Sequence, residues 1–152
     1  AVAGCTHVAH VASPIPAQAP RHEDNLIVPA REGTLRALRF ARDAGVTRFV
    51  QTSSTAAVVY GVDRGTYTFD ESHWTNVDHP DAYPYVKSKT IAERAARDWV
   101  AAEGGALEFV SVNPGMVLGP VDSGDFSASV ELVQQLLSGA MPMAPNLGFP
   151  IV

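Results

Sequence analysis

Short apolar runs alternate with longer amphipathic segments along this chain of 152 residues, and the alternation strongly constrains its fold. Strand-like runs are predicted at 6–14, 46–54 and 106–115, and helices at 23–45 and 81–105. Strands separated by helices of this length form parallel sheets, because only a long crossover returns the chain to start a parallel neighbour. The sequence therefore predicts a doubly wound α/β fold, Rossmann-like, with a parallel sheet covered by helices on both faces.

Proline and glycine mark one bend and the ends of these helices. Pro29 is expected to kink the first helix, which ends at Gly45, and Gly104-Gly105 closes the second. A further helix is predicted at 126–139, and the last four residues, 149–152, read FPIV and are predicted to begin another strand.

Charge and composition narrow the class of partner. The net charge is −5 and no run of lysines or arginines occurs, which argues against a nucleic-acid or anionic membrane surface and favours a small-molecule partner. A single cysteine, Cys5, excludes an internal disulfide and is expected to be buried. With no signal peptide and no apolar run of about 20 residues, the expected compartment is the cytoplasm.

The three predicted strands end in small, polar or turn-forming residues. These ends are Ala12-Ser13-Pro14, Thr52-Ser53-Ser54 and Asn113-Pro114-Gly115. In open parallel sheets, ligands bind beyond the carboxyl ends of the strands, so a site is predicted at this edge. Strands must end in turn residues in any case, so this pattern alone does not separate a site from ordinary loops.

The stretch YPYVKSK, residues 83–89, contains the spacing Tyr-x-x-x-Lys twice, as Tyr83 with Lys87 and as Tyr85 with Lys89. Pro84 suits the first turn of a helix and biases the residue before it toward extended backbone, so Tyr83 is expected outside the regular helix. Tyr85 and Lys89 then share one helix face in adjacent turns. They are the candidate pair.

A lysine beside a tyrosine can make the phenol an acid or base at neutral pH. Lowering a tyrosine pKa from ~10 to ~7 requires roughly 4 kcal/mol. One ammonium ~4 Å away at an effective dielectric constant of ~20 supplies about that amount. The same spacing also arises by chance on solvated helix surfaces, so the pair needs support from its surroundings.

That support comes from a resemblance. Tyr85-Val86-Lys87-Ser88-Lys89 followed by Ala92-Glu93 resembles the Tyr-x-x-Ser-Lys helix of the extended short-chain dehydrogenase/reductases, the NAD-dependent epimerase/dehydratase superfamily. RFVQTSSTAAVVYG resembles the serine-bearing strand end of that family, and SVNPGMVLGP its segment after the catalytic helix. HVASP and the DE-x-x-W motif at 70–74 are similar to the dihydroflavonol-reductase-like and cinnamoyl-CoA-reductase-like NADP-dependent carbonyl reductases.

The resemblance implies a role for each matching residue. Tyr85 would be the general acid, Lys89 would lower its pKa and bind the nicotinamide ribose, and Ser54 would polarise the carbonyl. Ser53 takes that place if the alignment shifts by one residue. The cofactor would be NADP (NADPH) rather than NAD, and the residues implied in binding it are Ala12, Ser13, Thr52, Tyr85, Lys89, Pro114 and Val117.

The sequence departs from the family in one respect, because no glycine-rich dinucleotide fingerprint occurs in it. Residues 1–152 are therefore expected to be the central and C-terminal part of a Rossmann-like dinucleotide-binding domain, incomplete at both ends. From about 115 to 152 the chain is expected to run into a substrate-binding region. No metal site is expected, because His7 and His10 lie three apart on a strand and so face opposite sides.

Three functional hypotheses follow. The favoured one is NAD(P)H-dependent reduction of an aldehyde or ketone by an oxidoreductase that contains this chain. The second is a nucleotide-sugar epimerase or dehydratase, which would use the same Ser-Tyr-Lys triad with transient oxidation. The third is a non-catalytic dinucleotide-binding protein, which would be expected to have lost Tyr85 or Lys89, and both are present.

Overall fold

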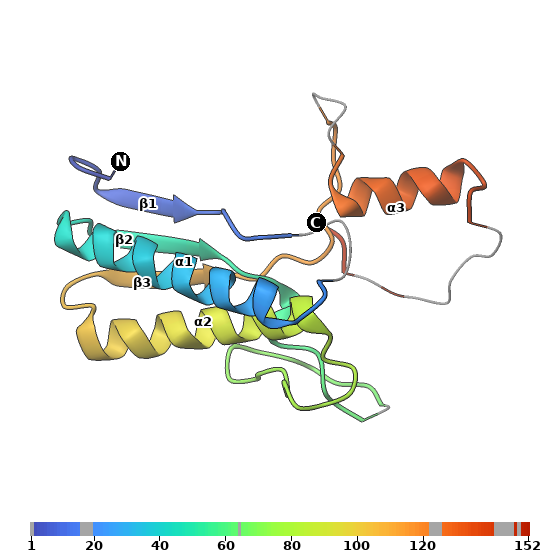
Figure 1. Cartoon of the computed structure of the whole chain (residues 1–152), viewed down its shortest axis with the longest axis horizontal. Coiled ribbons are helices and arrows are strands. Elements are labelled where there is room, and N and C mark those ends of the chain that lie inside the picture. The colour runs from blue at the N-terminus through green and yellow to red at the C-terminus, as the bar shows by residue number, and fades with distance from the viewer. Residues whose placement is uncertain (1, 16–19, 64, 122–125, 142–147, 149) are drawn as a thin grey trace. The chain divides into compact units, whose positions relative to one another are not determined.

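The computed structural model describes residues 2–15, 20–63, 65–121, 126–141, 148 and 150–152, and it divides into two compact units, Ala1–Asn113 and Pro114–Val152. The predicted alternation of strands and helices is confirmed in the first unit (Figure 1). Its elements are β1 (His7–His10), α1 (Asp24–Asp43), β2 (Arg48–Thr52), the 3-10 helix η1 (Thr55–Ala57), α2 (Pro84–Glu103) and β3 (Glu108–Val112). The second unit contains α3 (Ala128–Leu137).

The three strands form one parallel sheet in the order β1-β2-β3. Phe49 of β2 lies beside Val8 of β1 and Phe109 of β3, and Gln51 lies beside His10 and Ser111. Because all three strands point the same way, their carboxyl ends lie at one edge. The expectation of a parallel α/β sheet with a shared carboxyl edge is confirmed.

Both long helices of the first unit pack against each other and cover one face of the sheet (Figure 1). The opposite face carries Val110 and Val112, whose side chains are 44% and 50% exposed. Within this unit, the described helices thus lie on one face of the sheet. Its strand order never reverses, and successive crossovers of the usual right hand place their helices on the same side.

A core of apolar side chains joins the two helices to the central strand. Phe49 is fully buried at its centre, and its ring stacks 6.3 Å from that of Phe109. The buried residues of this core are Leu38, Ala41, Val46, Phe49, Ala96, Trp99 and Leu107. The helix α1 continues through Pro29 and is followed by Gly45 at φ 73°, where an L side chain would be strained.

The chain after β2 turns into η1, and a buried threonine attaches this turn to the following loop. Thr75 is 2% exposed; its hydroxyl donates to the carbonyl of Ala56 (2.7 Å) and accepts from the backbone N–H of Tyr60 (3.0 Å). The backbone N–H of Thr75 also donates to the carbonyl of Ala57 (2.9 Å). These hydrogen bonds hold a turn whose sequence shows no periodic pattern of apolar residues.

Two terminal expectations need correction. Cys5 is exposed rather than buried, because it lies in a turn that precedes β1, with its N–H bonded to the carbonyl of Val2. The predicted strand at 149–152 is reduced to an isolated parallel bridge between Met116 and Ile151, and Phe149 lies outside the described residues. None of the helices in the described ranges has the length and apolar character needed to cross a membrane.

Candidate active site

The first turn of α2 places Tyr85 and Lys89 as predicted. Tyr83 has extended backbone, with φ −70° and ψ 167°, and Pro84 begins the helix. Tyr85 and Lys89 therefore lie one turn apart on one face, and Lys89 Nζ is 5.7 Å from the centroid of the Tyr85 ring. Tyr85 also packs against the buried cluster of Ala56, Ala82 and Val86, which connects α2 to η1.

Lys89 is an unusual lysine because it is almost entirely buried, with 6% of its surface exposed. Burial lowers the pKa of Lys89 below its ordinary value of 10.5. Among the residues that the structure describes, none forms a hydrogen bond or an ion pair with its ammonium group. The side chain of Lys89 is largely buried and its ammonium has no protein acceptor among the described residues, so this position can take an acceptor from a ligand that carries hydroxyl or phosphate oxygens.

Tyr83 and Lys87, the other tyrosine and lysine of this segment, contact different residues. Lys87 Nζ forms a 2.7 Å ion pair with Glu23, the residue before α1, and so links the starts of the two helices. Tyr83 is half exposed and contacts Tyr60 edge to face at 5.9 Å. Burial, together with the neighbouring Tyr60 hydroxyl, raises the pKa of Tyr83. A phenol with a raised pKa is a weaker acid, so Tyr83 is a poor proton donor at neutral pH.

Ser53 and Ser54 directly follow β2 at the carboxyl edge, and both are buried. Ser54 has extended backbone and caps η1, with its hydroxyl accepting from the N–H of Ala56 at 3.1 Å. Its own hydroxyl proton remains free to donate to something else. Ser53 Oγ has no hydrogen-bond partner of ordinary geometry among the described residues. Which serine meets a carbonyl oxygen stays a prediction.

His10, the last residue of β1, is a neighbour of this site to which the sequence assigned no role. It is half buried, with its ring 5.6 Å from that of Phe49. Burial, and then the positive charge of Lys89, lower the pKa of His10 below its ordinary 6.5. His10 is therefore neutral at physiological pH, and it adds no positive charge beside Lys89.

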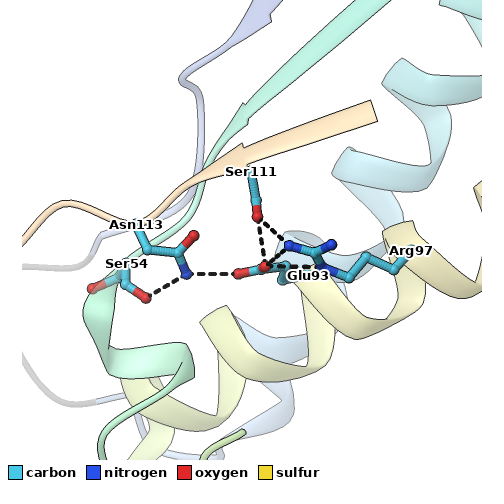
Figure 2. Close-up of polar contacts among 5 residues, drawn as sticks. All are labelled: Ser54, Glu93, Arg97, Ser111 and Asn113. Carbon is cyan, nitrogen blue, oxygen red and sulfur yellow. Dashed lines mark hydrogen bonds and ion pairs between the residues drawn. The ribbon is translucent and has the colours of Figure 1, made fainter. Parts of the chain in front are cut away.

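One turn beyond Lys89, Glu93 is buried and is the centre of a polar cluster (Figure 2). Arg97 Nη2 and Ser111 Oγ donate to Glu93 Oε1 at 2.9 Å and 2.7 Å. The side-chain amide of Asn113 donates to Glu93 Oε2 at 2.9 Å and to the carbonyl of Ser54 at 3.0 Å. Burial alone would raise the pKa of Glu93, but the nearby Ser53 hydroxyl and the hydrogen bonds from Ser111, Asn113 and Arg97 outweigh it and hold that pKa below 4.5.

Sequence reasoning quoted Glu93 and Asn113 only as parts of motifs and gave neither a role. One available signal was the spacing along α2, where Tyr85, Lys89, Glu93 and Arg97 follow one another at intervals of four. Four polar or ionisable residues on a helix face that packs inward require partners, because buried charges are costly unless paired.

The remaining predicted cofactor residues divide between the two units. Ala12 and Ser13 follow β1, and Thr52 ends β2, so all three lie at the same carboxyl edge as Ser54. Pro114 and Val117 belong to the second unit, and their part in cofactor binding stays a prediction. In the described part of the chain, no three His, Cys, Asp or Glu residues gather where they could hold a metal ion.

Known proteins resemble the chain over most of its length. The dihydroflavonol 4-reductase of Gerbera hybrida is 33% identical over 144 residues, which cover 91% of this chain and 39% of that protein. The anthocyanidin reductase of Vitis vinifera, described as (2S)-flavan-3-ol-forming, is 33% identical over 145 residues, covering 91% and 42%. The yeast methylglyoxal/isovaleraldehyde reductase Gre2, solved with NADPH, superposes with a TM-score of 0.83 at 28% identity, covering 97% and 48%.

The chain thus spans less than half the length of each of these relatives. The fold expected from the sequence, a Rossmann-like parallel sheet with helices, is confirmed, and Gre2 shares it. The model of the family described as "NAD dependent epimerase/dehydratase family" matches residues 1–145. The chain belongs to the NAD dependent epimerase/dehydratase family.

Proposed function

We propose that the complete protein containing this chain reduces an aldehyde or ketone with NADPH. The observation that carries the proposal is the pair on α2, in which the ammonium of the largely buried Lys89 lies 5.7 Å from the centroid of the Tyr85 ring. The named relatives are reductases, and Gre2 was solved with NADPH, which supports the reaction class and the choice of cofactor.

In this proposal Tyr85 donates its hydroxyl proton to the carbonyl oxygen of the substrate. The positive charge of Lys89 favours the phenolate that remains, and its N–H groups bind hydroxyls of the cofactor ribose. The Ser54 hydroxyl donates to the same carbonyl oxygen and stabilises the charge that develops there. When bound, the reduced nicotinamide supplies the hydride to the carbonyl carbon.

The same proposal extends to residues after β3. Pro114 and Val117 contribute to cofactor binding, and the residues from about 115 to 152 begin the substrate-binding region. A nucleotide-sugar epimerase or dehydratase is the second candidate, because the matching family is named for those reactions.

The test is an assay of the complete protein for oxidation of NADPH by a panel of aldehydes and ketones. Wild type is expected to turn over at least one of them, and Tyr85→Phe to lose at least ~10² in kcat, the low end for general acid catalysis. Parallel assays with sugar nucleotides and NAD distinguish the second candidate. Conversion of a sugar nucleotide without any carbonyl reduction would replace the first proposal with the second.

A further inference from the structure

The two carboxylate oxygens of Glu93 accept hydrogen bonds from different residues. We call Glu93, Arg97, Ser111 and Asn113 the Glu93 cluster (Figure 2). Its Oε1 end accepts from Arg97 and Ser111, and Arg97 also donates to Ser111 Oγ at 2.6 Å. Its Oε2 end accepts from the Asn113 amide, whose nitrogen also donates to the carbonyl of Ser54. Only the second end reaches the proposed catalytic serine.

The charge of Glu93 determines which way the Asn113 amide faces. A carboxylate only accepts hydrogen bonds, so the amide must present its NH₂ group to Glu93. That nitrogen carries two hydrogens, and the second is aimed at the Ser54 carbonyl, 3.0 Å away. The hydrogen bonds from Ser111, Asn113 and Arg97 hold the pKa of Glu93 low, so the carboxylate remains charged at neutral pH.

The hydrogen bond from Asn113 to the Ser54 carbonyl restrains the ψ torsion of Ser54. Rotation about Cα–C, which sets ψ, moves this carbonyl, and ψ of Ser54 is 152°. On the other side, the backbone N–H of Ser53 donates to the carbonyl of Val112 at 2.8 Å. The peptides on both sides of the serine pair are therefore anchored to the end of β3, which limits how far the Ser54 side chain can shift.

We propose that Glu93 is a positioning residue for carbonyl reduction: its charge orients Asn113, and Asn113 holds the backbone of Ser54 so that its hydroxyl meets the substrate oxygen. This inference rests on the proposed reductase function. It assigns to Glu93 an effect that reaches the substrate only through Ser54.

Glu93→Gln tests the role of charge at almost unchanged size. Arg97 and Ser111 both donate to the Oε1 position, so they retain the glutamine oxygen there and turn its NH₂ toward Asn113. Asn113 must then flip to accept, and its oxygen comes to face the Ser54 carbonyl. Two acceptors repel each other, so the serine peptide loses its anchor.

The experiment is a double-mutant cycle in the complete protein, with wild type, Glu93→Gln, Ser54→Ala and the double variant assayed for NADPH-dependent carbonyl reduction. Glu93→Gln is expected to lower kcat by about tenfold or more, since misplacement of a reacting group is costly, while KM for NADPH changes little. In the Ser54→Ala background the same substitution is expected to have no further effect on kcat.

Ser111→Ala is the matched control, because it removes a hydrogen bond from the Oε1 end and leaves Asn113 and Ser54 untouched. It is expected to lower thermal stability while kcat stays close to wild type. An unchanged kcat in Glu93→Gln, or an equal loss in both backgrounds, would show that Glu93 only joins α2 to β3 and would overturn the proposal.

Failure of the underlying function is separately visible. If wild type reduces no carbonyl substrate, the proposed function falls and the positioning role falls with it. If wild type is active and Ser54→Ala lowers kcat, the proposed function stands, and the double-mutant cycle alone decides whether Glu93 acts through Ser54. Should Glu93→Gln not fold, Asn113→Ala replaces it in the same cycle, with the same two criteria, because it removes the bridge itself.

Discussion

Two tyrosines separated by one residue have different surroundings, and the difference decides which one can act. Tyr85 lies on the inner face of α2 with the ammonium of Lys89 near its ring, whereas Tyr83 precedes the helix and contacts Tyr60. Lys87 is already paired with Glu23. The spacing of Tyr83 and Lys87 is thus explained by structural contacts rather than by catalysis.

The first prediction compares the two tyrosines directly. Tyr83→Phe should leave kcat within about a factor of two, because the phenol outside the helix transfers no proton, while Tyr85→Phe should lower it by at least ~10². Steady-state kinetics of both variants with NADPH check this. Equal losses would contradict the assignment, and a loss confined to Tyr83→Phe would reverse it.

The second prediction concerns the serine pair. Ser54→Ala should reduce kcat strongly while affinity for NADPH changes little, because the hydroxyl acts where charge develops, a contact typically worth ~3 kcal/mol. Ser53→Ala should have the smaller effect on kcat. Kinetics together with titration of NADPH measure the two separately, and a silent Ser54→Ala beside a damaging Ser53→Ala would shift the alignment by one residue.

At the scale of elements, the turn after β2 depends on the hydrogen bonds of one threonine. Thr75→Val keeps the shape but leaves the Ala56 carbonyl and the Tyr60 N–H unpaired, and each buried unpaired group costs about 1–3 kcal/mol. We expect the free energy of unfolding to fall by at least about 2 kcal/mol. Chemical denaturation of the complete protein measures it.

Thr90→Val is the matched control for this substitution. Thr90 is also fully buried, but its hydroxyl bonds to the Val86 carbonyl, which already accepts the helical N–H of Thr90. The control should therefore cost less than about 1 kcal/mol. Equal losses of unfolding free energy in the two variants would contradict the prediction that the hydrogen bonds of Thr75 stabilise the turn at η1.

The buried carboxylate between α2 and β3 makes a pH-dependent contribution to stability. The folded pKa of Glu93 lies below its ordinary 4.5, so the stabilisation from its charged form is fully present above pH 4.5 and is lost as the pH falls through the folded pKa. The stability difference between wild type and Glu93→Gln should therefore shrink on acidification below pH 4.5. Urea unfolding across pH 3 to 7 tests this, and a constant difference would contradict it.

The elements themselves could be predicted because each has a local pattern. The period of α2, Pro84 at its start and Gly105 after its end determine that helix without any tertiary information. The Glu93 cluster could not be predicted in the same way, since Glu93 and Asn113 lie twenty positions apart and meet only through the packing of α2 on β3. The turn after β2 is held by single hydrogen bonds from Thr75, which leave no periodicity in a sequence.

At the scale of the whole molecule, the side of the sheet on which each helix lies could not be predicted, for a related reason. Local patterns give the number of strands and helices, but the side on which a helix lies depends on the strand order, which no segment reveals alone. In the first unit both helices lie on one face, and the face bearing Val110 and Val112 is exposed. The parallel direction of the strands could be predicted because it follows from crossover length.

Residues 1–152 expressed alone should bind NADPH weakly and show no measurable carbonyl reduction. In folds of this kind a glycine-rich turn brings the pyrophosphate to a helix N-terminus, and this sequence contains no such fingerprint. Calorimetric titration with NADPH measures the affinity. Micromolar binding together with turnover of a simple aldehyde would show that the glycine-rich turn is dispensable.

The ion pairs made by residues of α2 also have an electrostatic consequence. Glu93 is neutralised by Arg97, and Lys87 by Glu23, while His10 is uncharged at neutral pH. Among the described residues, no carboxylate pairs with Lys89, which lies at the carboxyl edge of a chain whose net charge is −5. Because the screening length at 0.1 M salt is about 10 Å, an anionic ligand is attracted by Lys89 only once it is close to this edge.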